Sequence, residues 1–149
     1  MGDLHYRRAT PDDIAGMAEV RAGDWGTVER WGEIMRLYLA GEHHPRHRIA
    51  FVCADGERIV ALVAGHLTRR FGCDGELEWI SVRPQYRRDG VATQLLRRLA
   101  EWFVSQGARR ICVDVQPANR SARAFYARHG ATELNPHWMV WEDIGKLCE

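Results

Sequence analysis

The chain has 149 residues, a length that suits one domain over residues 1–149 with a substantial core. No Pro/Ser-rich linker or break in composition divides it. The 21 basic and 20 acidic residues give a net charge of +1, which argues against a nucleic-acid or membrane protein held mainly by electrostatic attraction.

The first 41 residues predict a short strand and two helices. Thr10 and Pro11 form a helix start, because threonine can cap a helix and proline suits its first position. Apolar residues at helical spacing continue that helix and recur in a second one, which Gly41 ends. The expected elements are a strand at residues 5–9, a helix from residue 11 to about 22, a connection at 23–26 and a helix at 27–39.

Aromatic and acidic residues in the second of these segments have two interpretations. A stripe such as Trp31 and Tyr38 at helical spacing usually belongs to a core. The same rings, with Glu29 and Glu33 between them, could instead wall a pocket for a cationic substrate. The candidate substrate-binding residues are Trp25, Glu29, Trp31 and, on a later strand, Trp79.

Three histidines occur in the polar segment that follows. His43 and His44 are adjacent, Pro45 stiffens the segment, and no carboxylate lies at a spacing suited to a preformed metal site with His47. We therefore expect a solvated loop and no metal site.

Residues 49–82 predict an antiparallel meander. An Asp-Gly turn at residues 55–56 separates two β-rich apolar runs, which is a hairpin signal. The second run is expected to continue towards Arg70, and after a turn at residues 71–75 the segment 76–82 returns as a third strand.

A strand, a glycine-containing turn and a helix follow one another without a break between Glu78 and Phe103. Pro84 ends the strand, and Gly90 marks the entry to a helix with apolar residues at every fourth position. The free N–H groups of a helix's first turn attract anions, and Arg87 and Arg88 stand beside them. The stretch is therefore either a phosphate or pyrophosphate site or a purely structural junction.

The residues of this turn favour a phosphate or pyrophosphate site over a purely structural junction. Residues 87–92, Arg-Arg-Asp-Gly-Val-Ala, fit the pattern Gln/Arg-x-x-Gly-x-Gly/Ala and follow Val-Arg-Pro-Gln-Tyr. The stretch closely resembles the central motif of the GNAT superfamily of acyl-CoA-dependent N-acyltransferases.

The remainder of the chain predicts a strand, a helix and two further strands. The run at residues 110–115 would pair in parallel with the strand before the turn through a right-handed crossover. Asn119 caps a helix that Gly130 ends, and the segments 131–134 and 138–142 are the last strand candidates. Residues 119–131 also resemble the family's Asn-x-x-Ala-x-x-Phe-Tyr-x-x-x-Gly-Phe signature, with Ala131 where an aromatic residue is common.

The resemblance implies an α/β (α+β) fold. The mixed, mostly antiparallel sheet would have about six to seven strands and about four flanking helices, and it would be splayed at the strand before the pyrophosphate turn. The cofactor would be acetyl-CoA as cosubstrate, with no metal. The implied cofactor-binding residues are Ile80, Ser81, Val82, Arg87, Arg88, Asp89, Gly90, Val91, Ala92, Asn119 and Tyr126.

The chemistry of amide formation suggests three catalytic candidates. A protonated amine must lose a proton before it attacks a thioester, so a carboxylate or a water chain serves as general base. Glu76, and after it Glu78, are the best candidates because they share a strand face upstream of the acetyl position. Tyr126 would give its proton to the leaving thiolate. Each of these residues also has a plain structural alternative, as an ion-pair partner or a buried phenol.

The expected partner is a small cationic amine, and the competing acceptor is a protein N-terminus or lysine. Two other classes stay open, namely a silent acyl-CoA-binding module and an arginine-rich nucleic-acid binder, although exposed interleaved aromatics are lacking for the second. Trp138, Val140 and Trp141 could form a homodimer seam or part of the core. Four scattered cysteines suggest neither zinc nor disulfides, and with no signal peptide or long apolar run we expect a cytoplasmic protein, not a membrane protein.

Overall fold

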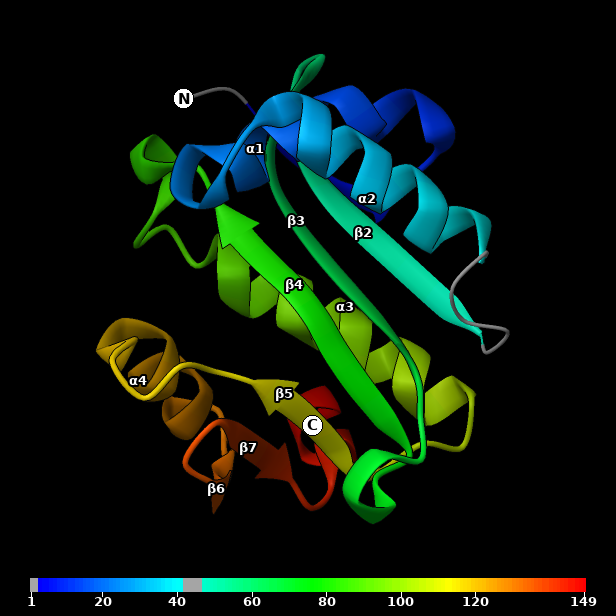
Figure 1. The fold of residues 1–149 in the computed structure, drawn as a ribbon, viewed down its shortest axis with the longest axis vertical. Coiled ribbons are helices and arrows are strands. Elements are labelled where there is room, and N and C mark those ends of the chain that lie inside the picture. Colours follow the sequence, from blue (N-terminus) through cyan, green and yellow to red (C-terminus); the bar gives the residue numbers. More distant parts are fainter. Residues whose placement is uncertain (1–2, 42–46) are drawn as a thin grey trace.

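The computed structural model describes residues 3–41 and 47–149, apart from the side chains of Asp24 and Trp25. These residues form a seven-stranded sheet in the order β1-β2-β3-β4-β5-β7-β6 and four α-helices (Figure 1). The strands are β1 (Leu4–Arg8), β2 (Arg48–Asp55), β3 (Arg58–Leu67), β4 (Gly75–Val82), β5 (Ile111–Asp114), β6 (Thr132–Asn135) and β7 (Trp138–Trp141). The helices are α1 (Ile14–Trp25), α2 (Val28–Ala40), α3 (Val91–Ser105) and α4 (Arg120–Arg128).

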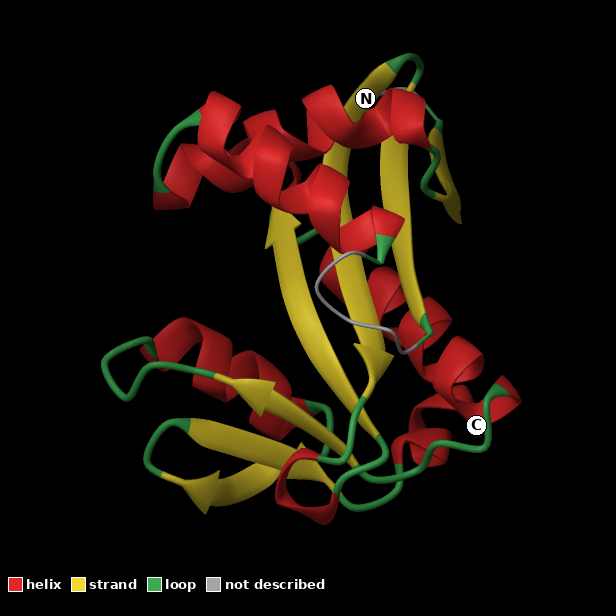
Figure 2. Cartoon of the chain, turned by 45° about the vertical axis from the view of Figure 1, so that its right-hand side comes forward, coloured by secondary structure: helices red, strands yellow, loops and turns green. Residues whose placement is uncertain are grey.

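The mixed sheet expected from the sequence is confirmed. Every neighbouring pair of strands is antiparallel except β4 and β5, which run parallel on either side of the crossover through α3. Helices lie on both faces of the sheet (Figures 1 and 2). Among the helices in the described ranges, none is long and apolar enough to cross a lipid bilayer.

Three boundaries differ by three residues from the sequence prediction. The sequence predicts that the first helix begins at residue 11, but Pro11–Asp13 forms a 3-10 turn and α1 begins at Ile14. Helix α1 continues through Gly23 to Trp25, and the break to α2 falls at Gly26, whose φ of 112° is closed to most other residues. Strand β3 ends at Leu67 and does not run towards Arg70, because the Thr68 N–H bonds the Asp74 carbonyl at 3.0 Å and turns the chain back. A 3-10 turn, Arg70–Gly72, then places the Arg70 side chain beside β4.

The sheet separates two apolar clusters. On one face α1 and α2 pack through Met17 and Met35 against a cluster that includes Leu62 and Trp79. On the other face α3 packs through residues such as Phe103, and α4 belongs to the same cluster. A hydrogen bond of 3.1 Å between Thr93 and His129 also links α3 to α4. Around β4, helices α1 and α2 therefore lie on one face of the sheet, and α3 and α4 lie on the other.

The expected splay at β4 is present. Parallel pairing with β5 is limited to three residues at the start of β4, where Gly75 pairs with Ile111 and Leu77 with Val113. From Trp79 to Val82, β4 pairs with β3 only, while β5 turns away (Figure 2). The β5 side of this half of β4 is thus open at the centre of the sheet.

A β-bulge lies where the splay begins. Gly65 of β3 pairs with Leu77 and Ala64 pairs with Trp79, so Glu78 is the extra residue on β4. A Cβ atom on Gly65 would lie 2.9 Å from the carbonyl oxygen of Glu76, so the close approach of the strands requires glycine there. Because a bulge locally re-aims side chains, the alternation of the strand does not by itself fix the direction of Glu78.

The C-terminal strand residues that could have formed a dimer seam mostly belong to the interior. Val140 and Trp141 are 3% and 2% exposed, and the Trp141 indole donates a hydrogen bond of 3.0 Å to the His129 carbonyl. Trp138 is half-buried and packs edge-on against the exposed ring of Phe71. Core packing therefore accounts for Val140 and Trp141.

Candidate functional site

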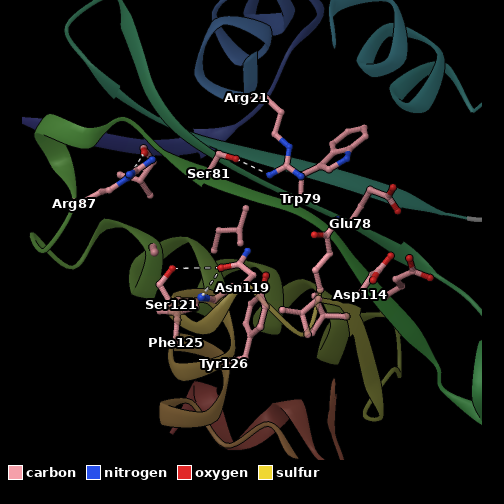
Figure 3. A pocket seen from close by; sticks show the side chains of 18 of the residues that line it. Arg21, Glu78, Trp79, Ser81, Arg87, Asp114, Asn119, Ser121, Phe125 and Tyr126 are labelled. Carbon is pink, nitrogen blue, oxygen red and sulfur yellow. Dashed lines mark hydrogen bonds between the residues drawn. The ribbon is translucent and has the colours of Figure 1, made fainter. Parts of the chain in front are cut away.

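The splay opens into a cavity of about 830 Å³. Its lining comes from α1, β4, β5, the start of α3 and α4. Figure 3 shows Arg21, Ser81 and Trp79 on one side of the cavity and Asn119, Phe125 and Tyr126 on the other. The lining residues are Arg21, Glu76, Glu78, Trp79, Ile80, Ser81, Val82, Arg87, Ala92, Val113, Asp114, Val115, Gln116, Ala118, Asn119, Ser121, Ala122, Phe125 and Tyr126.

One end of the cavity is the turn that leads into α3. Arg88 and Gly90 have φ values of 73° and 77°, so two left-handed residues bend the chain before the helix starts. No side chain caps the helix at Gly90, and the first intrahelical bond in this turn runs from the Gln94 N–H to the Gly90 carbonyl at 3.0 Å. The earlier N–H groups of α3 have no intrahelical acceptor, which is the backbone arrangement that favours anions at a helix start.

The residues of this turn contribute in different ways. The Arg87 side chain lines the cavity and donates from Nε to the Val82 carbonyl at 2.9 Å. Arg88 and Asp89 are exposed on the turn, whereas the Val91 side chain is buried in the α3 core and can offer only its backbone. The turn thus presents main-chain donors and positive charge together.

The open half of β4 forms one long wall. Ile80, Ser81 and Val82 all line the cavity, as expected. Ile80 and Val82 pack against the cluster on the α3 face, while the neighbouring Trp79 belongs to the cluster on the α1 and α2 face. Residues of this half of β4 therefore pack into the apolar clusters on both faces of the sheet.

Helix α4 supplies the opposite wall through Asn119 and Tyr126. The Asn119 Oδ1 accepts the Ala122 N–H at 3.2 Å, so the predicted cap is confirmed and the residue still borders the cavity. Tyr126 is 5% exposed and packs edge-on against Trp141 with ring centroids 5.5 Å apart. Burial raises the pKa of Tyr126 to about 12, and the nearby charge of Arg21 opposes that rise.

Glu76 and Glu78 meet at one end of the same cavity. Together with His66, each of them offers a ligand atom, and these atoms lie within 4.8 Å of one another. Glu76 is 6% exposed, and its Oε1 accepts from Arg70 Nε at 3.0 Å. Glu78 makes its closest described ionic approach to His66, from Oε2 to Nδ1 at 3.8 Å.

The two carboxyl groups differ in their protonation. Burial raises the pKa of Glu76, but the positive charge and hydrogen bond of Arg70 act against that rise. Burial, and next the negative charge of Glu76, raise the pKa of Glu78 to about 7. With a pKa of about 7, Glu78 can exchange a proton near neutral pH.

His66 and two aromatic side chains pack near Glu76 and Glu78 on the face of the sheet covered by α1 and α2. The Tyr38 hydroxyl lies 2.9 Å from His66 Nδ1, and the rings of Tyr38 and Trp79 have centroids 4.7 Å apart. His66 is buried on β3 opposite Glu76, so only the pairing of two strands brings it here. No feature of the sequence around His66 indicated it.

The four candidate substrate-binding residues are dispersed. Trp79 lines the cavity, and Trp31 lies behind it with ring centroids 5.6 Å apart. Glu29 is exposed on α2 and is not among the residues that line the cavity. The side chain of Trp25 lies outside the described part of the structure. Of the candidates whose side chains are described, Trp79 of β4 lines the cavity, whereas Trp31 and Glu29 of α2 do not.

Arg21 on α1 is a cavity residue that the sequence analysis missed. It donates from Nη1 to Ser81 Oγ at 2.8 Å (Figure 3). Its guanidinium also lies 5.1 Å from the centre of the Trp31 ring. A signal was present, because Arg21 continues the spacing of the buried residues Met17 and Ala18 on the same helix. An arginine at a position of an apolar helical stripe predicts a charged side chain that is at least partly buried.

Two groups of residues contain side chains of the types that bind metals. His43 and His44 lie outside the described residues, and His47 is exposed with its Nδ1 3.0 Å from Gln106 Oε1. The trio of His66, Glu76 and Glu78 has donor atoms of metal-binding type, but the Arg70 guanidinium already holds one oxygen of Glu76.

The sequence matches a known protein family and several of its characterised or named members. A family model described as the acetyltransferase (GNAT) family matches residues 29–131. The uncharacterized N-acetyltransferase YobR of Bacillus subtilis (strain 168) is 29% identical over 96 residues, which cover 64% of this chain and 38% of that protein. An aminoglycoside N(6')-acetyltransferase type 1 of Salmonella typhimurium is 33% identical over 66 residues, 42% of this chain and 46% of that protein. The match thus spans less than half the length of each of these relatives.

Solved structures resemble the chain over nearly its whole length. Aminoglycoside N-acetyltransferase AAC(6')-Iy in complex with CoA superposes with a TM-score of 0.78 at 20% identity, over 91% of each chain. A GNAT-family protein of Desulfovibrio desulfuricans gives 0.77 at 16% identity, over 95% of this chain and 99% of that one. The PaiA N-acetyltransferase of Thermoplasma acidophilum, bound to coenzyme A, gives 0.73 at 14% identity, over 93% and 98%. At these identities the likeness is one of fold.

Proposed function

The chain belongs to the acetyltransferase (GNAT) family, and from this membership we propose that it moves an acetyl group from acetyl-CoA to the primary amine of a small molecule. The acceptor would be cationic at its reacting nitrogen and would attack directly in a ternary complex. One observation carries this proposal: a single cavity joins the anion-binding turn before α3 to the Glu76–Glu78 pair along the open half of β4.

The chain offers suitable groups for each part of acetyl-CoA. The main-chain donors of residues 88–92, with Arg87, would hold the pyrophosphate, because uncapped N–H groups and the helix dipole favour phosphate oxygens. The open edge from Ile80 to Val82 would hydrogen-bond the pantetheine arm and the acetyl carbonyl in place of a neighbouring strand. Asn119 would contact the arm from α4.

Glu78 is our choice of general base, ahead of Glu76. Its carboxylate lines the cavity, its side chain is 29% exposed, and its pKa of about 7 is matched to proton transfer at neutral pH. Glu76 is held by Arg70 and acts mainly by keeping negative charge beside Glu78. Glu78 would take a proton from the ammonium group, either directly or through a water molecule.

Tyr126 is our choice of general acid. After the amine nitrogen bonds to the carbonyl carbon, the carbon–sulfur bond breaks and the sulfur leaves as a thiolate. The Tyr126 hydroxyl borders the cavity and would give its proton to that sulfur, and the proton lost by the product nitrogen would restore the phenol. The net products are the acetamide, the free thiol of CoA and one proton.

The acceptor amine would lie on the side of β4 that faces α1 and α2. Glu76, Glu78 and Asp114 provide negative charge near the ammonium group, and Trp79 provides an apolar wall. An aminoglycoside is the acceptor in the names of two relatives, one by sequence and one by structure, which supports a small amine over a protein N-terminus or lysine.

Calorimetry and a transfer assay test the proposal together. We expect folded protein to bind acetyl-CoA and to release free CoA thiol in the presence of at least one amine from a panel of polyamines, aminoglycosides, amino acids and N-terminal peptides. Mass spectrometry would identify the acetylated product. Absence of any acyl-CoA uptake contradicts the proposal, and uptake without transfer to any acceptor would instead indicate a non-catalytic acyl-CoA-binding module.

A further inference from the structure

A half-buried arginine, Arg21, faces the part of the cavity where the acceptor would lie. Arg21 is carried by α1 on the face of the sheet that also bears Trp79, whereas the turn before α3 and the α4 wall lie on the other face. Its charge is close enough to oppose the pKa rises of both Glu78 and Tyr126. Arg21 therefore adjoins the two groups that would handle protons during transfer.

The guanidinium of Arg21 is held in a fixed orientation. The Arg21 guanidinium donates to Ser81 Oγ at 2.8 Å, and the Trp31 ring packs against it at 5.1 Å from the ring centre. A planar guanidinium held in place by such contacts suits a planar anion, because a carboxylate can accept parallel N–H bonds from it.

The acceptor side of the cavity holds charge of both signs. Arg21 shares the cavity with Glu76, Glu78 and Asp114, and Arg70 already neutralises part of Glu76. Glu29 and Glu33, which could have attracted further positive charge, are exposed on α2 and do not line the cavity. A ligand with one cationic and one anionic group matches this distribution better than one with several ammonium groups.

We propose that Arg21 binds a carboxylate of the acceptor, so that the substrate is an amino acid or another small amine that carries a carboxylate. The inference rests on the proposed acetyl transfer and narrows its substrate class. The acceptor's ammonium group would face Glu78, and its carboxylate would face Arg21 in the same cavity.

The experiment compares each acid with its own amide. Suitable acceptors are L-amino acids, β-alanine and γ-aminobutyrate, each paired with the corresponding amide. We expect kcat/KM to be at least about tenfold higher for the preferred acid than for its amide, the scale of a charge-assisted hydrogen-bonded pair. An α-amino amide loses its ammonium proton more readily than the acid, so amine basicity does not explain such a preference.

Variants then assign the preference to Arg21. Arg21→Gln should raise KM for the acid and abolish the preference, with kcat/KM for the amide little changed, and Arg21→Lys should restore part of it. Arg83→Gln is the matched control, because Arg83 also links α1 to the end of β4, through Glu19 at 3.2 Å, but does not line the cavity. This control should keep the preference.

A binding measurement separates this inference from the proposed function. Calorimetric titration of acids and amides into the protein alone, and into protein with CoA added, needs no turnover. Arg21-dependent binding of an acid would support the inference even if no transfer occurred. The inference is overturned if amides bind and react as well as acids, or if Arg21→Gln slows both equally, since the second result would indicate a role in catalysis or in folding.

Discussion

At the scale of single residues, Glu76 and Glu78 carry the same carboxyl group but have different neighbours. Arg70 holds Glu76 at 3.0 Å, while Glu78 lines the cavity beside a second negative charge. Burial raises the pKa of both carboxyl groups, but the charge and hydrogen bond of Arg70 oppose the rise at Glu76, whereas the charge of Glu76 adds to the rise at Glu78.

The first prediction concerns the pH dependence of this pair. Glu78→Gln should lower kcat by roughly 10²- to 10⁴-fold, the usual contribution of a general base, with the Kd of acetyl-CoA little changed. In the unmodified protein kcat/KM should rise with pH and level off above about 7. Glu76→Gln should retain activity but move this rise to lower pH, because the Glu76 charge helps to raise the pKa of Glu78. A rate profile of Glu78→Gln that matches the unmodified protein would remove Glu78 from its assigned role.

The second prediction concerns the proposed acid. Tyr126→Phe keeps the ring packed against Trp141 but removes the hydroxyl, so it should lower kcat by roughly 10²-fold while acetyl-CoA affinity changes little. Tyr86→Phe is the control, because Tyr86 is also buried but bonds Asp55 outside the cavity. Steady-state rates and calorimetry on both variants distinguish the two sites, and an unchanged rate for Tyr126→Phe would exclude the acid role.

Residue roles that depend on local chain geometry could be predicted, and those that depend on strand pairing could not. Asn119 as a cap and Gly90 before a helix follow from neighbouring residues alone. His66 reaches Glu76 only through the β3–β4 register, and the bulge at Glu78 inserts a residue that strand alternation cannot reveal. Arg21 joined the site because α1 crosses the open part of the sheet, which its spacing on the helix does not specify.

At the scale of elements, the start of α3 is specified by backbone conformation. Gly90 has φ 77°, and a Cβ atom there would have nothing within 4 Å, so glycine is required for its conformation and not for lack of space. The same is true of Gly107 after the other end of α3, also at φ 77°. The two glycines are equivalent in conformation but only Gly90 adjoins the anion-binding turn.

The third prediction uses that equivalence. Gly90→Leu and Gly107→Leu should each lower the free energy of unfolding by about 1–2 kcal/mol, the cost of a side chain in the left-handed region. Gly90→Leu alone should abolish CoA binding, because the substitution shifts the main-chain donors of the turn. Urea unfolding and calorimetry measure the two effects. Equal losses of CoA affinity in both variants would mean that strain in α3, and not the turn, controls binding.

Most elements could be predicted because their periodicity and end signals agreed. The exceptions are both ends of α1 and the end of β3. The sequence offers two glycines for the end of α1, and the helix passes through Gly23 and breaks at Gly26, whose φ of 112° is closed to most other residues. Thr68 leaves β3 to bond Asp74, a partner six residues ahead, so a hydrogen bond outside the strand sets that boundary.

At the scale of the whole molecule, a proton acceptor inside the fold lowers stability at high pH. Glu78 has an ordinary pKa of 4.5 and one of about 7 in the folded protein, so folding favours its protonated form. This contribution to stability is fully present below pH 4.5 and is lost as the pH rises through 7. At 1.36 kcal/mol per pKa unit the loss is about 3 kcal/mol.

The fourth prediction follows from that linkage. Glu78→Gln should become more stable relative to the unmodified protein as the pH is raised from 5 to 8, by up to about 3 kcal/mol. Urea unfolding at the two pH values measures the difference, and Glu33→Gln, an exposed substitution on α2, is the control. A stability difference independent of pH would mean that Glu78 ionises in the folded protein as it does in the unfolded chain.

The open half of β4 also sets an order of events. Acetyl-CoA would fill the gap between β4 and β5 from the side of α3 and α4, and its thioester would then form the floor on which an amine rests from the side of α1 and α2. The floor is absent until acetyl-CoA arrives. Turnover should therefore follow a compulsory sequence in which the acyl donor enters first, and product-inhibition patterns should show CoA competing with acetyl-CoA but not with the amine.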